Sequence, residues 1–427
     1  MLNISANSKE ILEKAIKVFF TRVVGYGFGF LFTWIVASKF GPTIQGGFAI
    51  SLVFLSVGVI IAKLGIDTSL VKWIASSRNS SQEKHIIRKS AIIAIISSIL
   101  VGALVFFLAP LIAYMYQMPD IVVNIRWAAL GIPAISLLEI CGSIFKGKKE
   151  TTPFGVYVHI LKFAFPLFLI WILYLKGYVN LQIPTLAYSI GILATGFLAF
   201  THLFFRYKNI SSTKVDHLST SFILRESYPM MISSSIVMLM GWSDIFLLGF
   251  FSSKETIGIY STAVKLAATV SFIYNAVATI TTPKIAEFYA RNDETLLNNS
   301  VSFASRLMMI CGIPVFLTLM LFPEFFLGLF GEEYIKGSLV LRILIFAQIT
   351  NVLTGPVGPL FQMTGLQVKL QQFILLSLII NIVLSLILVQ SFGAKGVAFA
   401  SGVGMMVWNI LGAVYLYRKK SIKSWIH

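Results

Sequence analysis

The sequence is poor in charged residues and in cysteine, and each shortage excludes a class of protein. Charged residues make up 12% of the 427 residues, whereas hydrophobic residues make up 57%. Such a chain cannot cover its surface with polar groups as a water-soluble enzyme does. The two cysteines, Cys141 and Cys311, lie inside apolar runs. They therefore predict neither a disulfide framework nor a metal site.

Recognisable catalytic motifs are also missing. The five histidines are scattered without HExxH-type spacing, and no GxxxxGK[ST] loop is present to bind nucleotide phosphates. A membrane glycan polymerase or ligase, the nearest enzyme alternative, needs a sizeable extracytoplasmic loop with acid and base residues. The largest external loop that we expect, Pro323–Lys336, holds three glutamates that a solvated loop explains. The sequence thus predicts neither an enzyme nor a cofactor.

Apolar stretches of about 20 residues recur along almost the whole chain, each long enough to cross a hydrocarbon core of roughly 30 Å. They predict an all-α integral membrane protein. The polar stretch Met1–Lys17 is not followed by a small-residue cleavage site, so we expect no removable signal peptide. We count twelve membrane-spanning helices, at residues 17–38, 46–66, 90–114, 122–145, 153–175, 184–205, 222–251, 256–282, 298–322, 337–361, 369–390 and 394–417.

Basic residues are distributed unequally between the alternate loops. The loops on one predicted side, with both termini, contain 22 lysines and arginines, and those on the other side contain 5. Cytoplasmic loops carry the excess of lysine and arginine, so this distribution predicts that both termini are cytoplasmic. It also accounts for most of the net charge of +17, which in a water-soluble protein would suggest nucleic acid as a partner. We expect no nucleic-acid binding.

The two halves of the sequence resemble each other at two places. Gly47-Phe48 corresponds to Gly258-Ile259-Tyr260, and GSIF from Gly142 corresponds to GPLF from Gly358. The separations of 211 and 216 residues fit one duplication, and parallel repeats are a transporter architecture. A channel or a purely structural membrane protein fits this repeat less well. We predict six-helix bundles at 1–210 and 211–427, with a hinge in the polar connection Arg206–Leu224.

Several segments carry a family resemblance. They are RVVGYGFGFLFTWIVASKFGPTIQGGFAISL in the first two spans, DIFLLG at Asp244–Gly249, Thr364-Gly365, and the C-terminal LFQMTGLQVKLQQFILLSLIINIVLSLILVQSFGAKGVAFASGV, which contains Phe392–Gly396. In these the chain resembles the polysaccharide-transporter family of oligosaccharide-lipid flippases. That family includes the O-antigen flippases and belongs to the multidrug/oligosaccharidyl-lipid/polysaccharide exporter superfamily.

The resemblance implies a fold, a substrate and partners. The implied fold is a V-shaped pair of six-helix bundles that works by alternating access. The implied substrate is an oligosaccharide linked to undecaprenyl pyrophosphate, which moves from the cytoplasmic to the outer leaflet of a bacterial inner membrane. Membrane lipids and glycan polymerase machinery are the implied partners.

Cations inside the predicted spans are the candidate binding residues, because a cation at the bilayer centre costs at least about 2.5–3.5 kcal/mol on insertion scales. An anionic pyrophosphate is a strong ligand for arginine and lysine in such a site. Tyr26 follows Arg22 at helical spacing and adds a polar group for a sugar path. The four deep cations, which can line a water-filled cavity between the halves, are Arg22, Lys162, Lys265 and Arg306.

Three other cations lie nearer the ends of their spans. For Lys63, Arg126 and Arg342 we expect side chains that reach the membrane interface. The deep cations also have a structural alternative, which is pairing with an acidic side chain. Lys265 and Asp244 lie on consecutive spans at similar depth, so they are candidates for such a pair.

Acidic residues in the spans are fewer than the cations. Glu139 and Asp244 lie within spans and are candidates for an ion-coupling role or for a structural pair. A drug/cation antiporter of the same fold needs acidic, proton- or sodium-exchanging residues in its cavity, and the first span has none. The excess of cations therefore favours an anionic, lipid-linked substrate. A proton- or sodium-coupled cation antiporter is the alternative function.

Two further patterns have more than one interpretation. Gln348, Asn351 and Thr354 form a polar stripe that suits either a hydrated path or hydrogen bonding between helices. Gly25, Gly27 and Gly29 of the first span indicate either close approach of a neighbouring helix or a flexible gate. The sequence alone leaves both alternatives open.

Overall fold

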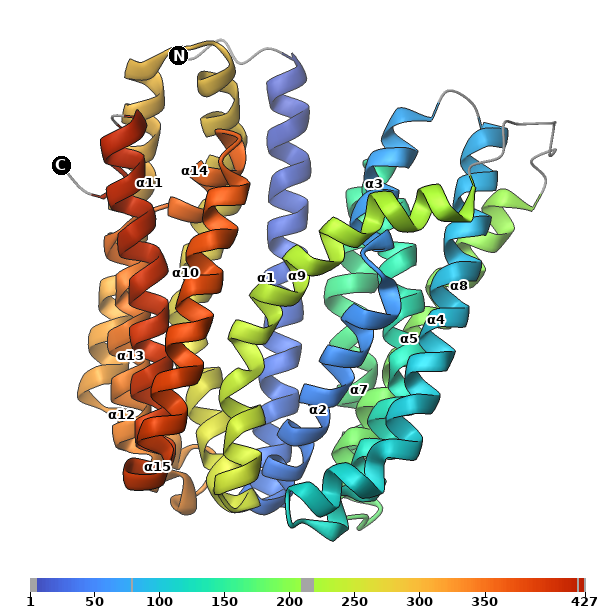
Figure 1. The fold of residues 1–427 in the computed structure, drawn as a ribbon, viewed down its shortest axis with the longest axis vertical. Coiled ribbons are helices and arrows are strands. Elements are labelled where there is room, and N and C mark those ends of the chain that lie inside the picture. Colours follow the sequence, from blue (N-terminus) through green and yellow to red (C-terminus); the bar gives the residue numbers. More distant parts are fainter. Residues whose placement is uncertain (1–5, 78–79, 209–218, 421, 426–427) are drawn as a thin grey trace. The chain divides into compact units, whose positions relative to one another are not determined.

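The computed structural model describes residues 6–77, 80–208, 219–420 and 422–425, with side chains from residue 17 onward. Within these ranges every regular element is a helix (Figure 1), as the sequence predicts. Eleven of the described helices or helix pairs are long and apolar enough to cross a membrane. The protein is therefore an all-α, multi-pass membrane protein.

The first half of the chain forms ten helical elements. Long spans alternate with short helices, and a 3₁₀ turn (η1) and a π-helical segment (η2) precede two of the spans. They are α1 Ala6–Phe40, α2 Pro42–Lys63, α3 Ile66–Ser76, α4 Ser80–Met115, η1 Pro119–Ile121, α5 Val122–Gly147, α6 Thr151–Phe154, η2 Gly155–Leu161, α7 Lys162–Leu175 and α8 Ile183–Tyr207.

The second half forms eight elements, one of them a 3₁₀ helix (η3). The external loop expected at Pro323–Lys336 is partly helical, because α12 and η3 lie in it. The elements are α9 Thr220–Phe251, α10 Lys254–Ala290, α11 Glu294–Leu321, α12 Pro323–Gly328, η3 Glu332–Gly337, α13 Ser338–Leu353, α14 Val357–Met363 and α15 Gln367–Lys420.

Two glycines interrupt the helices at the C-terminal end of the chain, one inside a predicted span and one between two predicted spans. The predicted tenth span, 337–361, is two helices, because Gly355 has a positive φ of 72° and separates α13 from α14. The 54-residue α15 contains both of the last two predicted spans. Gly393, with φ 55° and ψ −134°, interrupts its helical backbone. Glycine adopts such angles readily because it has no Cβ. If α15 is counted as two spans on either side of Gly393, the described residues contain about twelve spans, as the sequence predicts.

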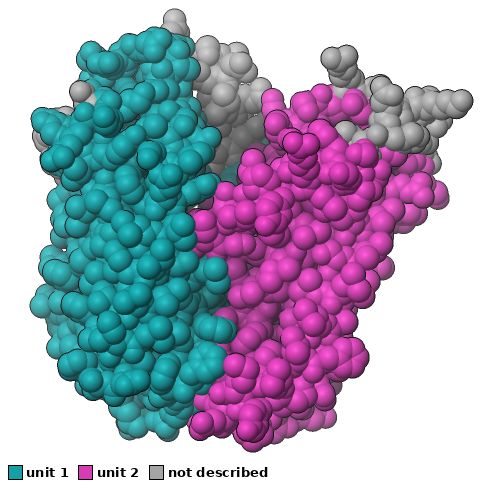
Figure 2. All heavy atoms as spheres, in the orientation of Figure 1, with its two compact units in different colours: residues 1–19, 239–427 teal, residues 20–238 magenta. Residues whose placement is uncertain are grey.

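The chain divides into two compact units, shown in different colours in Figure 2. Unit 2 comprises residues 20–238, and unit 1 comprises residues 1–19 and 239–427. The boundary between them falls within α9. The predicted bundles at 1–210 and 211–427 stay a prediction. Most of the predicted hinge, residues 209–218, lies outside the described residues.

Helix α5 is at the centre of unit 2. It packs against α2, α3, α4 and α8 and is the most buried of the candidate spans. Ile132, Leu138 and Phe145 of α5 are fully buried in one apolar cluster with Leu55 of α2 and Ile192 of α8. Because apolar side chains surround this helix, a charged residue on it requires a partner.

The backbone bends sharply between α2 and α3. Leu64 and Gly65 both have positive φ, 51° and 75°, and end the α2 helix. A Cβ on Gly65 would overlap with the carbonyl oxygen of Ser227 in α9, so a larger residue does not fit. The following helix α3 buries Leu70 and Trp73 in the unit 2 core. This segment lies between the predicted spans 46–66 and 90–114, and its 11 residues are too few to cross a membrane.

Unit 1 contains a polar network between its helices. Asn351 of α13 donates a hydrogen bond to Gln348 (2.9 Å) and accepts one from Asn409 of α15 (2.6 Å). Thr354 donates to the side chain of Asn409 at 3.4 Å. Ser271 of α10 donates to Gln348. The polar stripe of the tenth span thus bonds helices to one another. This supports hydrogen bonding between helices, rather than a hydrated path, as the role of the stripe.

Candidate functional site

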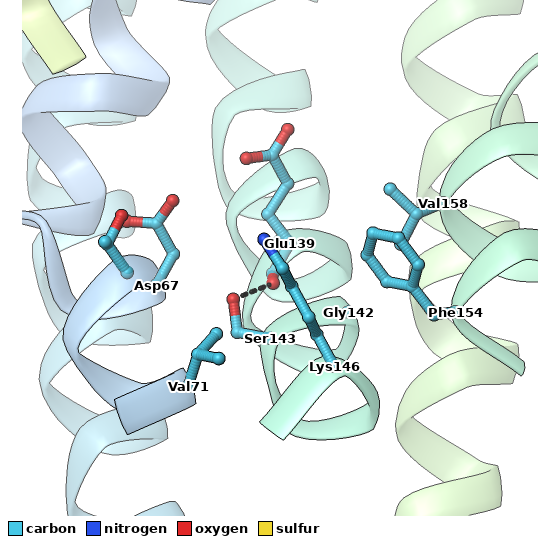
Figure 3. A pocket seen from close by; sticks show the side chains of 9 residues that line it. Asp67, Val71, Glu139, Gly142, Ser143, Lys146, Phe154 and Val158 are labelled. Carbon is cyan, nitrogen blue, oxygen red and sulfur yellow. Dashed lines mark hydrogen bonds between the residues drawn. The ribbon is translucent and has the colours of Figure 1, made fainter. Parts of the chain in front are cut away.

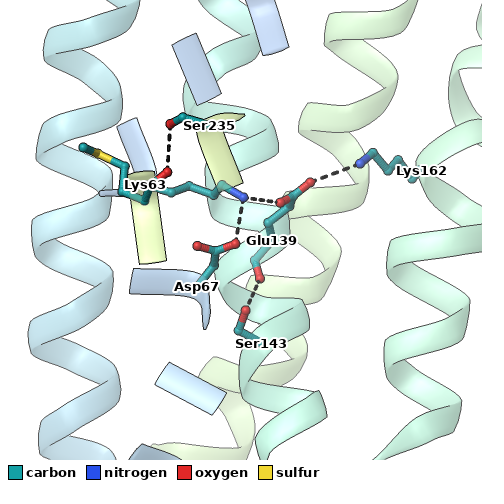
Figure 4. A network of polar contacts seen from close by, with 7 residues as sticks. Lys63, Asp67, Glu139, Ser143, Lys162 and Ser235 are labelled. Carbon is teal, nitrogen blue, oxygen red and sulfur yellow. Dashed lines mark hydrogen bonds and ion pairs between the residues drawn. The ribbon is translucent and has the colours of Figure 1, made fainter. Parts of the chain in front are cut away.

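Four charged side chains form a continuous chain of ion pairs in unit 2 (Figure 4). Lys63 Nζ lies 2.8 Å from Asp67 Oδ2 and 2.5 Å from Glu139 Oε2. Lys162 Nζ lies 3.3 Å from Glu139 Oε1. Glu139 therefore offers one carboxylate oxygen to each lysine. This series of ion pairs joins α2, α3, α5 and α7.

The position of Lys63 differs from the prediction. We expected its side chain to reach the interface, but Lys63 is buried and contacts two carboxylates. Lys63 is the last residue of α2 and Asp67 lies in the first turn of α3, so the break at Leu64 and Gly65 places them together. A buried ammonium is stable only where carboxylates compensate its charge. The interface prediction for Lys63 was therefore wrong.

Lys162 and His159 belong to an unusual stretch of the fifth span. η2 is a π-helix, and Lys162 is the first α-helical residue after it. In an α-helix, residues three apart lie on nearly the same face. The wider π turn rotates less per residue and separates such side chains. Here His159 accepts a hydrogen bond from Arg22 Nε of α1 at 3.4 Å, while Lys162 contacts Glu139 of α5.

Glycines let α1 approach this π-helical segment closely. A Cβ on Gly25 would overlap with the backbone of His159, and one on Gly29 would lie 3.2 Å from the Phe163 ring. A Cβ on Gly27 would have no neighbouring atom within 4 Å. Close approach is thus the explanation for Gly25 and Gly29. It does not apply to Gly27.

A cavity of about 320 Å³ borders the ion pairs (Figure 3). Asp67 and Val71 of α3 line one side, and Phe154 and Val158 line the other. Between them lie side chains of α5, including Glu139 and the exposed Lys146. Ser143 Oγ donates to the backbone carbonyl of Glu139 at 2.9 Å. The remaining lining residues are Thr68, Gly142 and Ser143.

Asp244 of unit 1 lies in a separate buried cluster. Its Oδ2 accepts a hydrogen bond from Tyr260 at 2.6 Å, and its Oδ1 accepts one from Asn381 at 3.3 Å. Asn381 also donates to Ser243 at 3.1 Å. These hydrogen bonds stabilise a buried carboxylate. The pairing of Asp244 with Lys265 stays a prediction.

The other predicted residues lie in several places. Tyr26 and Lys265 are half-buried, whereas Arg22 and Arg306 are exposed. Arg126 packs against the Phe106 ring, with 5.0 Å between the guanidinium carbon and the ring centroid. A substrate-binding role for Arg22, Arg306, Lys162, Lys265 or Tyr26 stays a prediction. Among the described residues, no cluster of three His, Cys, Asp or Glu side chains has a metal-site arrangement.

Comparison with known proteins decides the family. Residues 11–289 match the family described as polysaccharide biosynthesis protein, and residues 229–387 match the MatE family. The chain belongs to the polysaccharide biosynthesis protein family. A probable low-salt glycan biosynthesis flippase, Agl15 of Haloferax volcanii, is 24% identical over 425 residues, covering 97% of this chain and 85% of that protein. An uncharacterised membrane protein of Methanocaldococcus jannaschii is 24% identical over 429 residues, covering 96% of this chain and 99% of its own.

Solved structures show the same fold. An inward-facing multidrug-resistance MATE transporter of the MOP superfamily has a TM-score of 0.78 at 17% identity, covering 95% of this chain and 98% of its own. The lipid II flippase MurJ, in an inward closed conformation, has a TM-score of 0.77 at 15% identity, and the match covers 95% of this chain and 87% of MurJ. Together with the family match, these likenesses confirm the exporter superfamily that the sequence resemblance implied.

Proposed function

We propose that this protein flips an oligosaccharide linked to a polyprenyl phosphate or pyrophosphate across the membrane by alternating access. Its family, its likeness to a probable glycan flippase and its fold, which a lipid II flippase shares, support this proposal. The finer proposal is an undecaprenyl-pyrophosphate carrier and an O-antigen-like or capsule-like repeat unit. This lipid-linked repeat unit moves from the cytoplasmic to the outer leaflet of a bacterial inner membrane. Both termini of the protein lie in the cytoplasm.

The observation that carries the proposal is the concentration of basic groups in the spans of unit 2. Arg22, Lys63 and Lys162 all lie in candidate spans, and the last two are joined through Glu139 beside a cavity. Cations are costly in a membrane and are retained where they serve a function. Their chemistry suits a phosphate group, which accepts charge-assisted hydrogen bonds from guanidinium and ammonium groups.

The roles of the individual residues follow from their chemistry. In unit 2, Arg22 and Lys162 bind the phosphate group, and Tyr26, one helical turn from Arg22, contacts the sugar. In unit 1, Arg306 and Lys265 supply the second set of basic contacts. Glycan polymerase machinery receives the product on the outer side. Each assignment is tested separately by substitution.

The alternative function is a cation antiporter. The match of residues 229–387 to the MatE family and the MATE-like fold favour it. In that case Asp244 or Glu139 exchanges a proton or sodium ion. The charges of the unit 2 cluster favour an anion instead, because Lys63 and Lys162 already neutralise its two carboxylates.

The test is complementation in a flippase-deficient strain whose lipid-linked precursor is known. We expect this protein to restore surface glycan and to remove the precursor that accumulates on the cytoplasmic face. Cationic-dye efflux is measured in the same cells. Dye efflux without restored glycan, in several strains with different repeat units, contradicts the proposal and supports the antiporter.

A further inference from the structure

We infer that Glu139 is an internal counter-ion: it holds Lys162 when no substrate is bound, and the phosphate group of the substrate replaces it. This inference rests on the proposed function and adds a residue that controls substrate binding. Glu139 would act through Lys162 and set how tightly the anion is held. It is therefore a specificity-determining residue that does not itself contact the phosphate.

The first support is the geometry of the bridge. Each oxygen of Glu139 contacts a different lysine, at 2.5 Å for Lys63 and 3.3 Å for Lys162. A carboxylate that bridges two ammonium groups occupies the place that two oxygens of a phosphate would take. The contact to Lys162 is the longer of the two, so it is the weaker one. Lys162 is thus the lysine from which Glu139 separates more easily.

The second support is the order of exposure. The side chain of Glu139 is 28% exposed, whereas those of Lys162 and Lys63 are 18% and 9% exposed. Glu139 also lines the cavity of about 320 Å³, and neither lysine does. An anion that enters the cavity therefore meets the carboxylate of Glu139 before it meets Lys162 or Lys63. It reaches Lys162 only when Glu139 moves aside.

The third support is an asymmetry between the two lysines. Lys63 has a second carboxylate, Asp67, at 2.8 Å. When Glu139 moves, Lys63 keeps this ion pair, while Lys162 loses the carboxylate that it contacts. A buried ammonium without a partner is unfavourable. The phosphate supplies the missing partner, so its binding and the displacement of Glu139 favour each other.

The charges also argue against a cation in this cavity. Lys63, Lys162, Asp67 and Glu139 together carry no net charge, and Lys146 adds a positive charge to the cavity lining. A cation would have to compete with two lysines that are already in place. An anion has to displace only the carboxylate of Glu139. It then binds Lys162, which Glu139 has released.

The experiment measures binding of farnesyl pyrophosphate to the purified full-length protein in detergent micelles, with farnesol as the uncharged probe. Glu139→Gln removes the competing charge and keeps the side-chain size, so we expect about tenfold tighter binding of farnesyl pyrophosphate, the factor for one lost charge-assisted contact. Lys162→Gln is expected to weaken it about tenfold for the same reason. Farnesol binding changes little in either variant.

Asp67→Asn is the matched comparison, because it removes the same charge from the same cavity and leaves the Glu139 bridge in place. We expect it to tighten binding by less than about threefold, since Asp67 pairs with Lys63 and its charge acts on Lys162 only through the long-range field. An equal gain in Asp67→Asn and Glu139→Gln overturns the inference, because net charge then explains both. If Glu139→Gln does not fold, Glu139→Asp is used. Its shorter side chain loosens the bridge, and we expect an intermediate gain.

Two other results separate this inference from the proposed function. If the wild type prefers farnesyl pyrophosphate to farnesol and Lys162→Gln weakens binding, while Glu139→Gln has no effect or binds less tightly, the counter-ion role is wrong and the proposed function stands. If the protein does not distinguish farnesyl pyrophosphate from farnesol, both are wrong. Binding of a cationic dye that Glu139→Gln abolishes also overturns the inference.

Discussion

Glu139 of α5 and Lys162 of α7 form an ion pair at 3.3 Å, and this pair connects the most buried span of unit 2 to the π-helical fifth span. The same carboxylate contacts Lys63, so a single side chain links three spans. Removal of Glu139 leaves Lys162 without the carboxylate that it contacts, whereas removal of Lys162 leaves Glu139 paired with Lys63 alone. The pair therefore contributes to stability and, through Lys162, to the proposed phosphate site.

A double-mutant cycle measures this pair. We expect Lys162→Ala and Glu139→Ala each to lower the stability of the protein in detergent. The loss in the double mutant is smaller than the sum of the two, with a coupling energy of about 0.5–3 kcal/mol. Chemical unfolding followed by tryptophan fluorescence provides the values. Additive losses would show that the two side chains do not interact.

Glycine packing between α1 and the fifth span gives a second prediction. Gly25→Ala places a methyl group against the His159 backbone, and we expect a loss of about 1–3 kcal/mol from overpacking. Gly27→Ala is the control, because nothing lies within 4 Å of its new methyl group. Alanine is the better helix former by up to about 1 kcal/mol, so Gly27→Ala should be neutral or stabilising. Similar losses in both variants contradict the close approach.

The basic residues give a third prediction, which concerns function. Arg22→Ala and Arg306→Ala should abolish surface glycan at normal protein levels. Arg→Lys variants should keep part of the activity, because the charge stays while the bidentate contact is lost. Substitution of Arg126 or Arg342 by alanine should have milder effects, since Arg126 packs on Phe106 and Arg342 pairs with Glu324 at 3.3 Å. Complementation with immunoblotting is the measurement.

If abundant Arg22→Ala and Arg306→Ala proteins complement fully, phosphate binding at these two positions is wrong. If only one of the two variants fails to complement, the phosphate contacts are confined to the unit that contains the substituted arginine. Cationic-dye efflux by the same variants then shows whether the antiporter function accounts for the activity.

Topology gives a fourth prediction. The unequal distribution of basic residues predicts that the turn after α10 is cytoplasmic and that the segment before α13 is outside. Asn292 and Glu332 are exposed in these two segments. In a protein without Cys141 and Cys311, Glu332→Cys should react with an impermeant thiol reagent in intact cells. Asn292→Cys should react only after permeabilisation. The reverse pattern contradicts cytoplasmic termini.

The sequence predicted the spans well because their signal is local. A run of about 20 apolar residues specifies a spanning helix whatever surrounds it. The break at Gly355 and the short helix α3 were missed, because they depend on backbone angles and on packing. The break at Gly393 falls between the predicted spans 369–390 and 394–417, so the sequence did indicate it.

The ion pairs of unit 2 depend on tertiary structure and could be predicted only in part. Lys63 and Asp67 are four residues apart, which is a recognisable signal for a pair. The contacts of Glu139 with Lys63 and Lys162 join residues 76 and 23 positions apart, and no local pattern indicates them. The π-helical segment, which turns His159 toward Arg22 and Lys162 toward Glu139, also has no local signal.

The most direct test of the central claim is a flipping assay in proteoliposomes with the purified protein. The probe is a fluorescent oligosaccharide on polyprenyl pyrophosphate, and a membrane-impermeant quencher reports the fraction in the outer leaflet. We predict that the protein exposes the inner-leaflet probe to the quencher and that Arg22→Ala and Lys162→Gln slow this exposure. The matched probe on an uncharged polyprenol should cross far more slowly. Equal rates for both probes, or no exposure above protein-free liposomes, would contradict transport of a phosphate-linked glycan lipid.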